Sequence, residues 1–378
     1  MNGAPRIKGW CPGALRPMMS GDGLIVRVRP PLGRLNPHQV SGIAALATSC
    51  GNGIVDLSNR ANVQLRGVAA GRYEVLIDGL RALGVIDPDV TVESRRNILV
   101  TPFRNAGNAN ESLAEELASA LAATDAPDVS AKFGYAVDAG ATPVLQAAPA
   151  DIRLERGADG NLLVCAGAHR FGKPVTDGEA VSQMLTLARW SLGHGTRMFR
   201  VLTGGTALPQ GFTVPRQAAA PSPKPGLYPA GALVGMAFGQ IDAATLDALA
   251  NLGALRVTPW RMLLIEGADK LPLHPGLICD PEDPLLRIAA CVGAPGCAQA
   301  HAGTRAVARN LARYVPAGKT LHVAGCAKGC ALPRAASVTL TATAAGFDLI
   351  RNATADAAPE QTGLQPNDLP NYLQKALS

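Results

Sequence analysis

Two stretches of the chain, about 200 residues apart, share one pattern that decides the fold. Residues 21–68 read GDGLIVRVRPPLGRLNPHQVSGIAALATSCGNGIVDLSNRANVQLRGV, and residues 231–268 read GALVGMAFGQIDAATLDALANLGALRVTPWRMLLIEGA. Each predicts a strand, a turn, a capped helix and a second strand, with Asn36 and Asp242 as the caps. The alignment pairs Arg60 of the first copy with Arg261 of the second. We therefore expect a pseudo-symmetric duplication with a ligand site between the halves.

Each copy is followed by a second segment that mixes helices and strands. Helical periodicity predicts helices from Asn110, over about 178–192 and over about 298–314. The proline-rich stretch 215–225 is the expected linker between the halves. Residues after about Thr354 are expected to form a loosely attached tail.

Four cysteines near the C-terminus form two widely spaced pairs, in CVGAPGC (residues 291–297) and GCAKGC (residues 325–330). Zinc sites usually leave about two to four residues inside each pair, and disulfide frameworks belong to small secreted chains. Two wide pairs in glycine-rich backbone instead favour a 4Fe–4S cluster, which binds four thiolates. Cys291, Cys297, Cys326 and Cys330 are therefore the predicted cluster ligands. A structural zinc site and plain buried cysteines remain as alternatives.

The composition indicates a cytosolic redox enzyme rather than a nucleic-acid or membrane protein. The chain has 378 residues, a formal charge of +6 and only 4% aromatic residues, so it lacks the basic and aromatic runs of nucleic-acid binders. Its longest charge-free apolar stretch, 227–238, is short and predicts a buried strand instead of a membrane span. Eight cysteines without a secretion signal favour the cytoplasm. The four unpaired ones are expected to pack in the interior: Cys11, Cys50, Cys165 and Cys279.

Polar residues alternate with apolar ones in RANVQLR, residues 60–66. On a strand, this spacing would place Arg60, Asn62, Gln64 and Arg66 on one face. These four residues have long side chains that donate hydrogen bonds, and no acidic residue lies among them. This favours an anionic ligand, because guanidinium binds carboxylate through two hydrogen bonds. The alternative is an ordinary amphipathic strand with a solvated face. Arg27 and Arg29 alternate in the same way, with the two interpretations evenly balanced.

LSNRANVQLRGV (57–68), SRRNIL (94–99) and the two cysteine pairs resemble the nitrite and sulfite reductase hemoprotein family along nearly the whole chain. The resemblance implies an α+β, pseudo-two-fold duplicated fold. Ferredoxin-like half-domains would span 1–80 and 215–275, an α/β domain 81–214, and a 4Fe–4S cluster domain 276–378. It also adds Arg96 and Lys132 to the residues expected to bind a tetrapyrrole.

One departure bears on the cofactor. The family's paired basic residues fall here at Lys132-Phe133-Gly134, so a glycine replaces one of them. This disfavours bound siroheme but keeps an anion site, which would suit a tetrapyrrole substrate. The segments GWCPGALRPMMSGDGLIVRVRP (9–30), AKFGYAVD (131–138) and HVAGCAKGCA (322–331) most resemble a branch that acts on precorrin-3A.

That branch implies a monooxygenase of aerobic cobalamin biosynthesis, which uses dioxygen to hydroxylate precorrin-3A at C20 and close a lactone. The implied partners are an electron-donor system, with electrons derived from NADH, and a mononuclear non-heme iron with oxygen or nitrogen ligands. No residue pattern identifies that iron's ligands: the six histidines lack an H-x-D/E motif, and Asp22, Asp56 and Asp138 are only candidates. The alternative function is a siroheme-dependent nitrite or sulfite reductase, with Cys330 bridging to siroheme.

Overall fold

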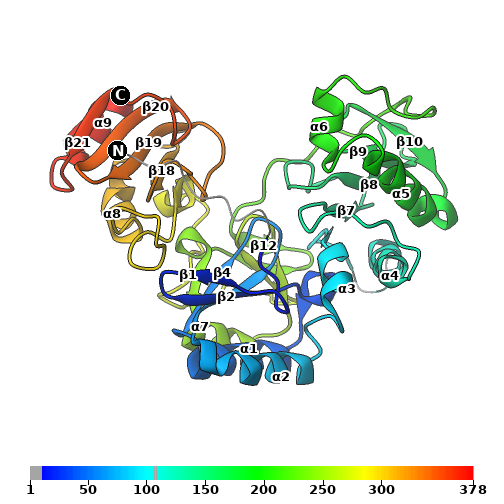
Figure 1. The fold of residues 1–378 in the computed structure, drawn as a ribbon, viewed down its shortest axis with the longest axis horizontal. Coiled ribbons are helices and arrows are strands. Elements are labelled where there is room, and N and C mark those ends of the chain that lie inside the picture. The colour runs from blue at the N-terminus through cyan, green and yellow to red at the C-terminus, as the bar shows by residue number, and fades with distance from the viewer. Residues whose placement is uncertain (1–10, 106, 108, 378) are drawn as a thin grey trace.

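The protein has two wings that rise from a shared base, as its computed structural model shows (Figure 1). The structure describes residues 11–105, 107 and 109–377. It contains four mixed or antiparallel sheets, two in the base and one in each wing. The fold is therefore α+β and duplicated, as predicted.

The base consists of two half-domains of matching architecture. The first contains β1 (Met18–Ser20), β2 (Gly23–Val28), β3 (Arg34–Leu35), α1 (Pro37–Cys50), β4 (Ile54–Leu57), β5 (Val63–Val68) and α2 (Tyr73–Ala82). The second contains β12 (Gly226–Tyr228), β13 (Gly231–Val234), β14 (Gln240–Asp242), α7 (Ala243–Ala250), β15 (Leu255–Val257) and β16 (Leu263–Glu266). The expected single strand over 227–238 is thus a hairpin of β12 and β13.

The two half-domains exchange one strand each. The first sheet has the order β1-β2-β5-β4-β14, and the second has the order β12-β13-β16-β15-β3. β14 pairs with β4, and β3 pairs with β15, both antiparallel. Residues of both halves consequently share one continuous hydrophobic core.

The helix starts follow the predicted capping chemistry. Asn36 accepts a hydrogen bond from the Gln39 amide at 2.9 Å, and the Gln39 side chain accepts one from the Asn36 amide. Asp242 caps α7 by accepting from the Thr245 amide at 2.9 Å. Both helices therefore begin where the strand that crosses to the other half ends.

Each wing carries a sheet whose first three strands are parallel. The wing of the first half contains α3 (Val90–Arg95), β6 (Ile98–Val100), α4 (Ala109–Ala122), β7 (Tyr135–Asp138), β8 (Ile152–Arg156), β9 (Leu162–Ala166), β10 (Phe171–Val175), α5 (Asp177–Leu192), α6 (Met198–Thr203) and β11 (Val214–Pro215). The wing of the second half contains β17 (Ile288–Ala290), α8 (Arg305–Leu311), β18 (Leu321–Ala324), β19 (Ala336–Thr343), β20 (Gly346–Ala353), β21 (Gln361–Leu364) and α9 (Leu369–Leu377). The predicted helices at Asn110 and 178–192 are present as α4 and α5.

Two expectations for the second wing were wrong. The helix expected over 298–314 begins only at Arg305, because the cysteine loop occupies the residues before it. The chain after Thr354 is not a loose tail: β21 joins the sheet, and Leu369, Leu373 and Leu377 of α9 are buried in this wing's core. Their spacing on one helix face is the signal that the sequence interpretation missed.

The structure also corrects the alignment of the two copies by one residue. Ala61 and Arg261 are the positive-φ residues of the two matching turns, with φ of 53° and 61°. Arg60 therefore corresponds to Trp260, not to Arg261. None of the described helices has both the length and the hydrophobicity of a transmembrane span.

Candidate functional site

Arg60 lies in the turn between β4 and β5 and not on the strand itself. The Ser58 side chain fixes this turn by accepting hydrogen bonds from the amides of Arg60 and Asn62, at 3.3 and 3.2 Å. β5 begins only at Val63. The predicted four-residue alternation therefore applies to Gln64 and Arg66, while Arg60 and Asn62 owe their positions to the turn.

Only one of the two terminal nitrogens of the Arg60 guanidinium has a hydrogen-bond partner among the described residues. Its Nη2 donates to the Lys132 carbonyl at 2.9 Å, whereas its Nη1 is buried and has no hydrogen-bond partner among the described residues. Burial lowers the pKa of Arg60, and the nearby Arg197 lowers it further. A buried cationic donor without a partner indicates a place where an anion can bind.

Gly134 explains how Arg60 fits there. A Cβ atom at this position would lie 3.3 Å from Arg60 Nη1 and 3.2 Å from Asn97 Nδ2. A larger side chain would therefore crowd the guanidinium. The glycine that replaces the family's basic residue thus gives space to Arg60.

Arg27 and Arg29 extend the same cationic site, which the sequence left undecided. Arg27 donates to Gln64 Oε1 at 2.6 and 3.0 Å, and burial lowers its pKa to about 10, with Cys11 beside it acting in the opposite direction. Arg29 is 6% exposed, and its Nε has no hydrogen-bond partner among the described residues. Burial also lowers the pKa of Arg29, although the nearby Glu93 opposes this shift.

We define Arg27, Arg29 and Arg60 as the arginine site. Within the described part of the chain, no carboxylate lies within ion-pairing distance of these three arginines. Lys132 is half-buried, and among the described residues its ammonium has no hydrogen-bond partner. The buried amide Nδ2 of Asn62 is similarly unpartnered there. The arrangement suits a ligand with several carboxylates.

The other two predicted arginines have protein partners. Arg96 forms a two-pronged pair with Asp87 at 2.6 and 2.9 Å and also donates to the Arg29 carbonyl at 2.9 Å. Arg66 is 5% exposed and pairs with Asp22 at 3.0 and 3.1 Å. Both side chains therefore form hydrogen bonds within the protein, and we do not assign them to ligand binding.

The loops that carry the four predicted cluster cysteines begin at the ends of two neighbouring parallel strands. Cys291 follows β17 and donates its amide to the Val323 carbonyl of β18 at 3.1 Å, while Cys326 and Cys330 follow β18. Cys330 is exposed as a residue, but desolvation of its thiol raises its pKa to about 11; the other three thiols act in the same direction and Lys328 opposes them. The pKa of Cys326 is also raised, by burial first and then by Cys297 and Cys291.

Glycines let the two cysteine loops approach each other. A Cβ on Gly325 would lie 2.7 Å from the Ala300 Cβ, and a Cβ on Gly293, whose φ is 75°, would lie 2.7 Å from the Thr304 amide nitrogen. A hydrogen bond from the His301 amide to the Gly325 carbonyl at 2.9 Å joins the loops. Four thiols on two neighbouring glycine-bearing loops match the number of ligands that a 4Fe–4S cluster binds, but among the described residues they do not converge on one point.

The described residues do not form a site for a single metal ion. In the described ranges, no three His, Cys, Asp or Glu side chains converge as they would on a single ion. Asp56 and Asp22 bind arginines, and Asp138 accepts from the amides of Val144 and Leu145. The residues described do not fit the mononuclear iron that the resemblance implies.

His322 behaves as a packing residue. It is fully buried on β18, and neither ring nitrogen has a hydrogen-bond partner in the described residues. Burial lowers its pKa to about 4, and Arg261 adds to this shift. The imidazole is therefore neutral at physiological pH. Of the unpaired cysteines, Cys50 and Cys165 are buried, whereas Cys11 and Cys279 are only partly so.

Hydrogen bonds join β5 and β1 of the first half-domain to the loop that carries Cys291 and Cys297. Arg66 Nη2 donates to the Gly296 carbonyl at 3.0 Å, and the Ser20 hydroxyl donates to the same oxygen at 2.7 Å. Arg305 of α8 pairs with Asp56 of β4 at 2.9 Å. These contacts place the loop of Cys291 and Cys297 beside the first half-domain.

Comparisons with known proteins agree with this architecture. Residues 16–83 match the family described as the nitrite/sulfite reductase ferredoxin-like half domain. A protein named precorrin-3B synthase, from Sinorhizobium sp, is 30% identical over 400 aligned positions, which cover 93% of this chain and 84% of the relative. The structure of the Mycobacterium tuberculosis NirA protein superposes with a TM-score of 0.57 at 17% identity, covering 93% of this chain and 79% of that one.

Proposed function

This chain belongs to the precorrin-3B synthase branch of the nitrite and sulfite reductase family, and from that premise we propose that it hydroxylates precorrin-3A at C20 with dioxygen. One oxygen atom forms the new C20–hydroxyl bond. The other becomes water, using two protons and two electrons from an external donor, for which we propose NADH-derived electrons. An acetate of ring A then closes a lactone. The observation that supports this most is the arginine site, which lacks a protein carboxylate among the described residues.

In this proposal, the arginine site holds the macrocycle by its carboxylates. Arg60 Nη1 and Arg29 Nε are buried donors that a carboxylate would satisfy. Lys132 adds a mobile positive charge at the rim, and Asn62 adds an amide donor. Because burial costs these cations solvation, a carboxylate ligand restores part of their charge stabilisation.

Neighbouring residues hold the side chains of the arginine site in place. Gln64 orients Arg27 through two hydrogen bonds to one oxygen. Arg96 is held by Asp87 and fixes the backbone of Arg29. We propose that Gln64 and Arg96 position the cationic donors and that Arg66 ties the cradle to the cysteine loop.

Cys291, Cys297, Cys326 and Cys330 would hold the cluster. A 4Fe–4S cluster bound by these thiolates supplies electrons one at a time. The described residues do not assemble a site for a mononuclear iron.

The test begins with protein purified without oxygen. Its visible spectrum, with iron and acid-labile sulfide assays, should reveal a 4Fe–4S cluster and no siroheme bands. Given precorrin-3A, a reductant and ¹⁸O-labelled dioxygen, the enzyme should place one labelled oxygen in the product. Stoichiometric siroheme together with nitrite or sulfite turnover, and no label in precorrin, would replace this proposal with the reductase. A colourless protein with zinc would replace the cluster.

A further inference from the structure

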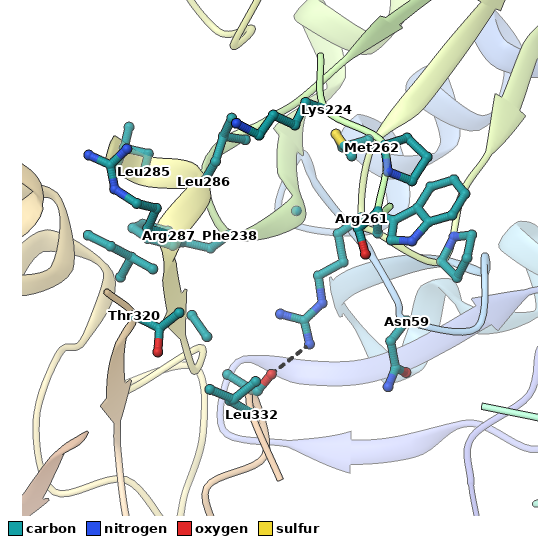
Figure 2. Close-up of a pocket in the computed structure, with 18 of the residues that line it drawn as sticks. Asn59, Lys224, Phe238, Arg261, Met262, Leu285, Leu286, Arg287, Thr320 and Leu332 are labelled. Atoms are coloured by element: carbon teal, nitrogen blue, oxygen red, sulfur yellow. Dashed lines mark hydrogen bonds between the residues drawn. The ribbon is translucent and has the colours of Figure 1, made fainter. Parts of the chain in front are cut away.

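A cavity lies mainly in the second half of the molecule. It has a volume of about 770 Å³ and lies between the second half-domain, the linker and the wing that carries the cysteines, and Asn59 and residues 147–149 of the first half line its edge (Figure 2). We call it the second-half pocket and define it by Phe238, Trp260, Arg261, Arg287, Lys319 and Arg334. Its volume is in the range of sites for organic ligands.

The pocket repeats the position of the arginine site through the internal duplication. The β15–β16 turn that supplies Trp260 corresponds to the β4–β5 turn that supplies Arg60. Phe238 at φ 62° matches Leu32 at φ 52°, in the short turns that follow β13 and β2. The two sites are therefore built from equivalent elements.

The wings contribute equivalent elements as well. Arg287 precedes β17 as Asn97 precedes β6. Thr320, which also lines the pocket, precedes β18 as Gly134 precedes β7. Lys319 stands one position away from the equivalent of Lys132, on the same loop. Both pockets thus receive a basic residue from the loop before the second parallel strand.

The charges in the pocket favour an anion. Arg287 Nε is buried without a hydrogen-bond partner among the described residues, while its other nitrogens donate to backbone carbonyls. Arg261 extends across the pocket, and Nη2 donates only to the Ala331 carbonyl at 3.1 Å (Figure 2). No ion pair is recorded for the exposed Lys319 and Arg334 in the described residues. Of the two acidic lining residues, Glu282 pairs with Lys224 at 2.5 Å, and Asp283 accepts a hydrogen bond from the Leu285 amide at 2.8 Å.

The apolar surfaces favour a flat ligand. Phe238, Met236, Trp260, Met262, Leu286 and Leu332 all line the pocket. Trp260 and Met262 stand where the first half has Arg60 and Asn62, so apolar side chains replace polar donors at these two positions. Aromatic and aliphatic walls with a cationic rim suit a macrocycle that carries carboxylates at its edge.

We propose that the second-half pocket binds a second carboxylated tetrapyrrole, separate from the one at the arginine site. The proposal rests on the proposed function for its ligand class. Binding there is expected to be weaker and more sensitive to salt, because most of its cations are at the exposed rim.

The experiment counts binding sites with coproporphyrin III, a tetracarboxylate porphyrin, added to the cluster-loaded protein. The wild type should bind two molecules per chain. The variant Lys319→Glu/Arg334→Glu should bind one, with affinity for the second lowered by about tenfold or more. The matched control Lys132→Glu, on the equivalent loop of the other half, should weaken the other binding event. Circular dichroism checks that both variants fold.

The outcomes separate the two proposals. One bound molecule that is insensitive to Lys319→Glu/Arg334→Glu would overturn the second-half pocket. Two sites that are both insensitive to that variant would overturn it equally. One bound molecule that depends on Lys319 and Arg334, but not on Lys132 or Arg60, would support this pocket and overturn the arginine site as the tetrapyrrole cradle. Turnover of precorrin-3A, measured separately, tests the proposed reaction itself.

Discussion

The guanidinium of Arg66 donates a hydrogen bond of 3.0 Å to the carbonyl oxygen of Gly296, the residue before Cys297. The same side chain pairs with Asp22 at 3.0 Å and lies 3.6 Å from Asp56. One buried arginine therefore holds two carboxylates of the first half-domain and a loop that belongs to the second. Removing it would leave buried charge and release the cysteine loop.

Arg66→Met should lower the free energy of unfolding by about 3–5 kcal/mol, because Asp22 and Asp56 lose a buried partner. It should also reduce retention of iron and sulfide under dilution. Chemical denaturation and a sulfide assay measure these effects. Arg81→Ala serves as the control: its pair with Asp78 is exposed, so a change of about 0–0.5 kcal/mol is expected. Equal behaviour of the two variants would refute the clamp.

Replacing any one of Cys291, Cys297, Cys326 or Cys330 by Ser should abolish the cluster and loosen the second wing, because metal binding is coupled to folding of its loops. Cys50→Ala is the matched control, since Cys50 is buried at the end of α1 in the first half-domain and belongs to neither cysteine pair. Iron and acid-labile sulfide are measured after anaerobic reconstitution. Full sulfide content in one of the serine variants would remove that cysteine from the ligand set.

Arg60→Ala should weaken binding of a carboxylated tetrapyrrole by about 2–4 kcal/mol, because the ligand loses a charge-assisted contact in a buried site. Titration with coproporphyrin III at low salt measures the change. Arg351→Ala, which removes an exposed ion pair with Glu360, is the control and should leave the affinity unaltered. If both variants bind equally, the turn faces no ligand.

Gly134→Ala should lower the affinity of the arginine site by roughly fivefold, or about 1 kcal/mol. The added Cβ would lie 3.2–3.4 Å from Asn97 Nδ2, Arg60 Nη1 and the Pro149 carbonyl, so the guanidinium must shift. The same titration measures this, and Gly71→Ala is the control, because its Cβ would meet nothing within 4 Å. An unchanged affinity would mean that Arg60 needs no space at Gly134.

His322 should make the protein less stable in mild acid. Its folded-state pKa of about 4 lies below the ordinary value of 6.5, so the unfolded chain binds more protons between these values. The stability due to neutral His322 is complete above pH 6.5 and is lost as pH falls toward 4. Relative to His322→Leu, the wild type should lose about 2 kcal/mol between pH 7.5 and pH 5 in urea denaturation.

The exposed His38 provides the comparison for that measurement. His38→Gln, measured in the same way, separates the effect of removing a buried histidine from that of removing an exposed one. Parallel curves for wild type and His322→Leu would show that His322 becomes protonated in the folded state or is hydrated.

Local patterns predicted the duplication well, because strands, caps and turns recur with the same chemistry in both halves. Asn36 and Asp242 cap helices as their side chains require. The sequence could not predict that Arg60 lies in a turn or that Arg66 forms an ion pair with Asp22. These outcomes depend on a positive φ at Ala61 and on a contact across 44 residues. Likewise, Arg29 is a candidate ligand residue because it is buried, and the alternation of polar and apolar residues does not predict this burial.

The reciprocal placement of β3 and β14 has a consequence for how such a chain could arise. Each sheet of the base is complete only when the other copy lends it a strand. If the ancestral gene encoded one half, its product would have been a strand-swapped homodimer, and the present linker would record the fusion of two subunits. Fusion would have freed the two copies to diverge, so that one could carry the four cysteines while the other specialised in arginines. Separately expressed halves should then reassemble only as a pair.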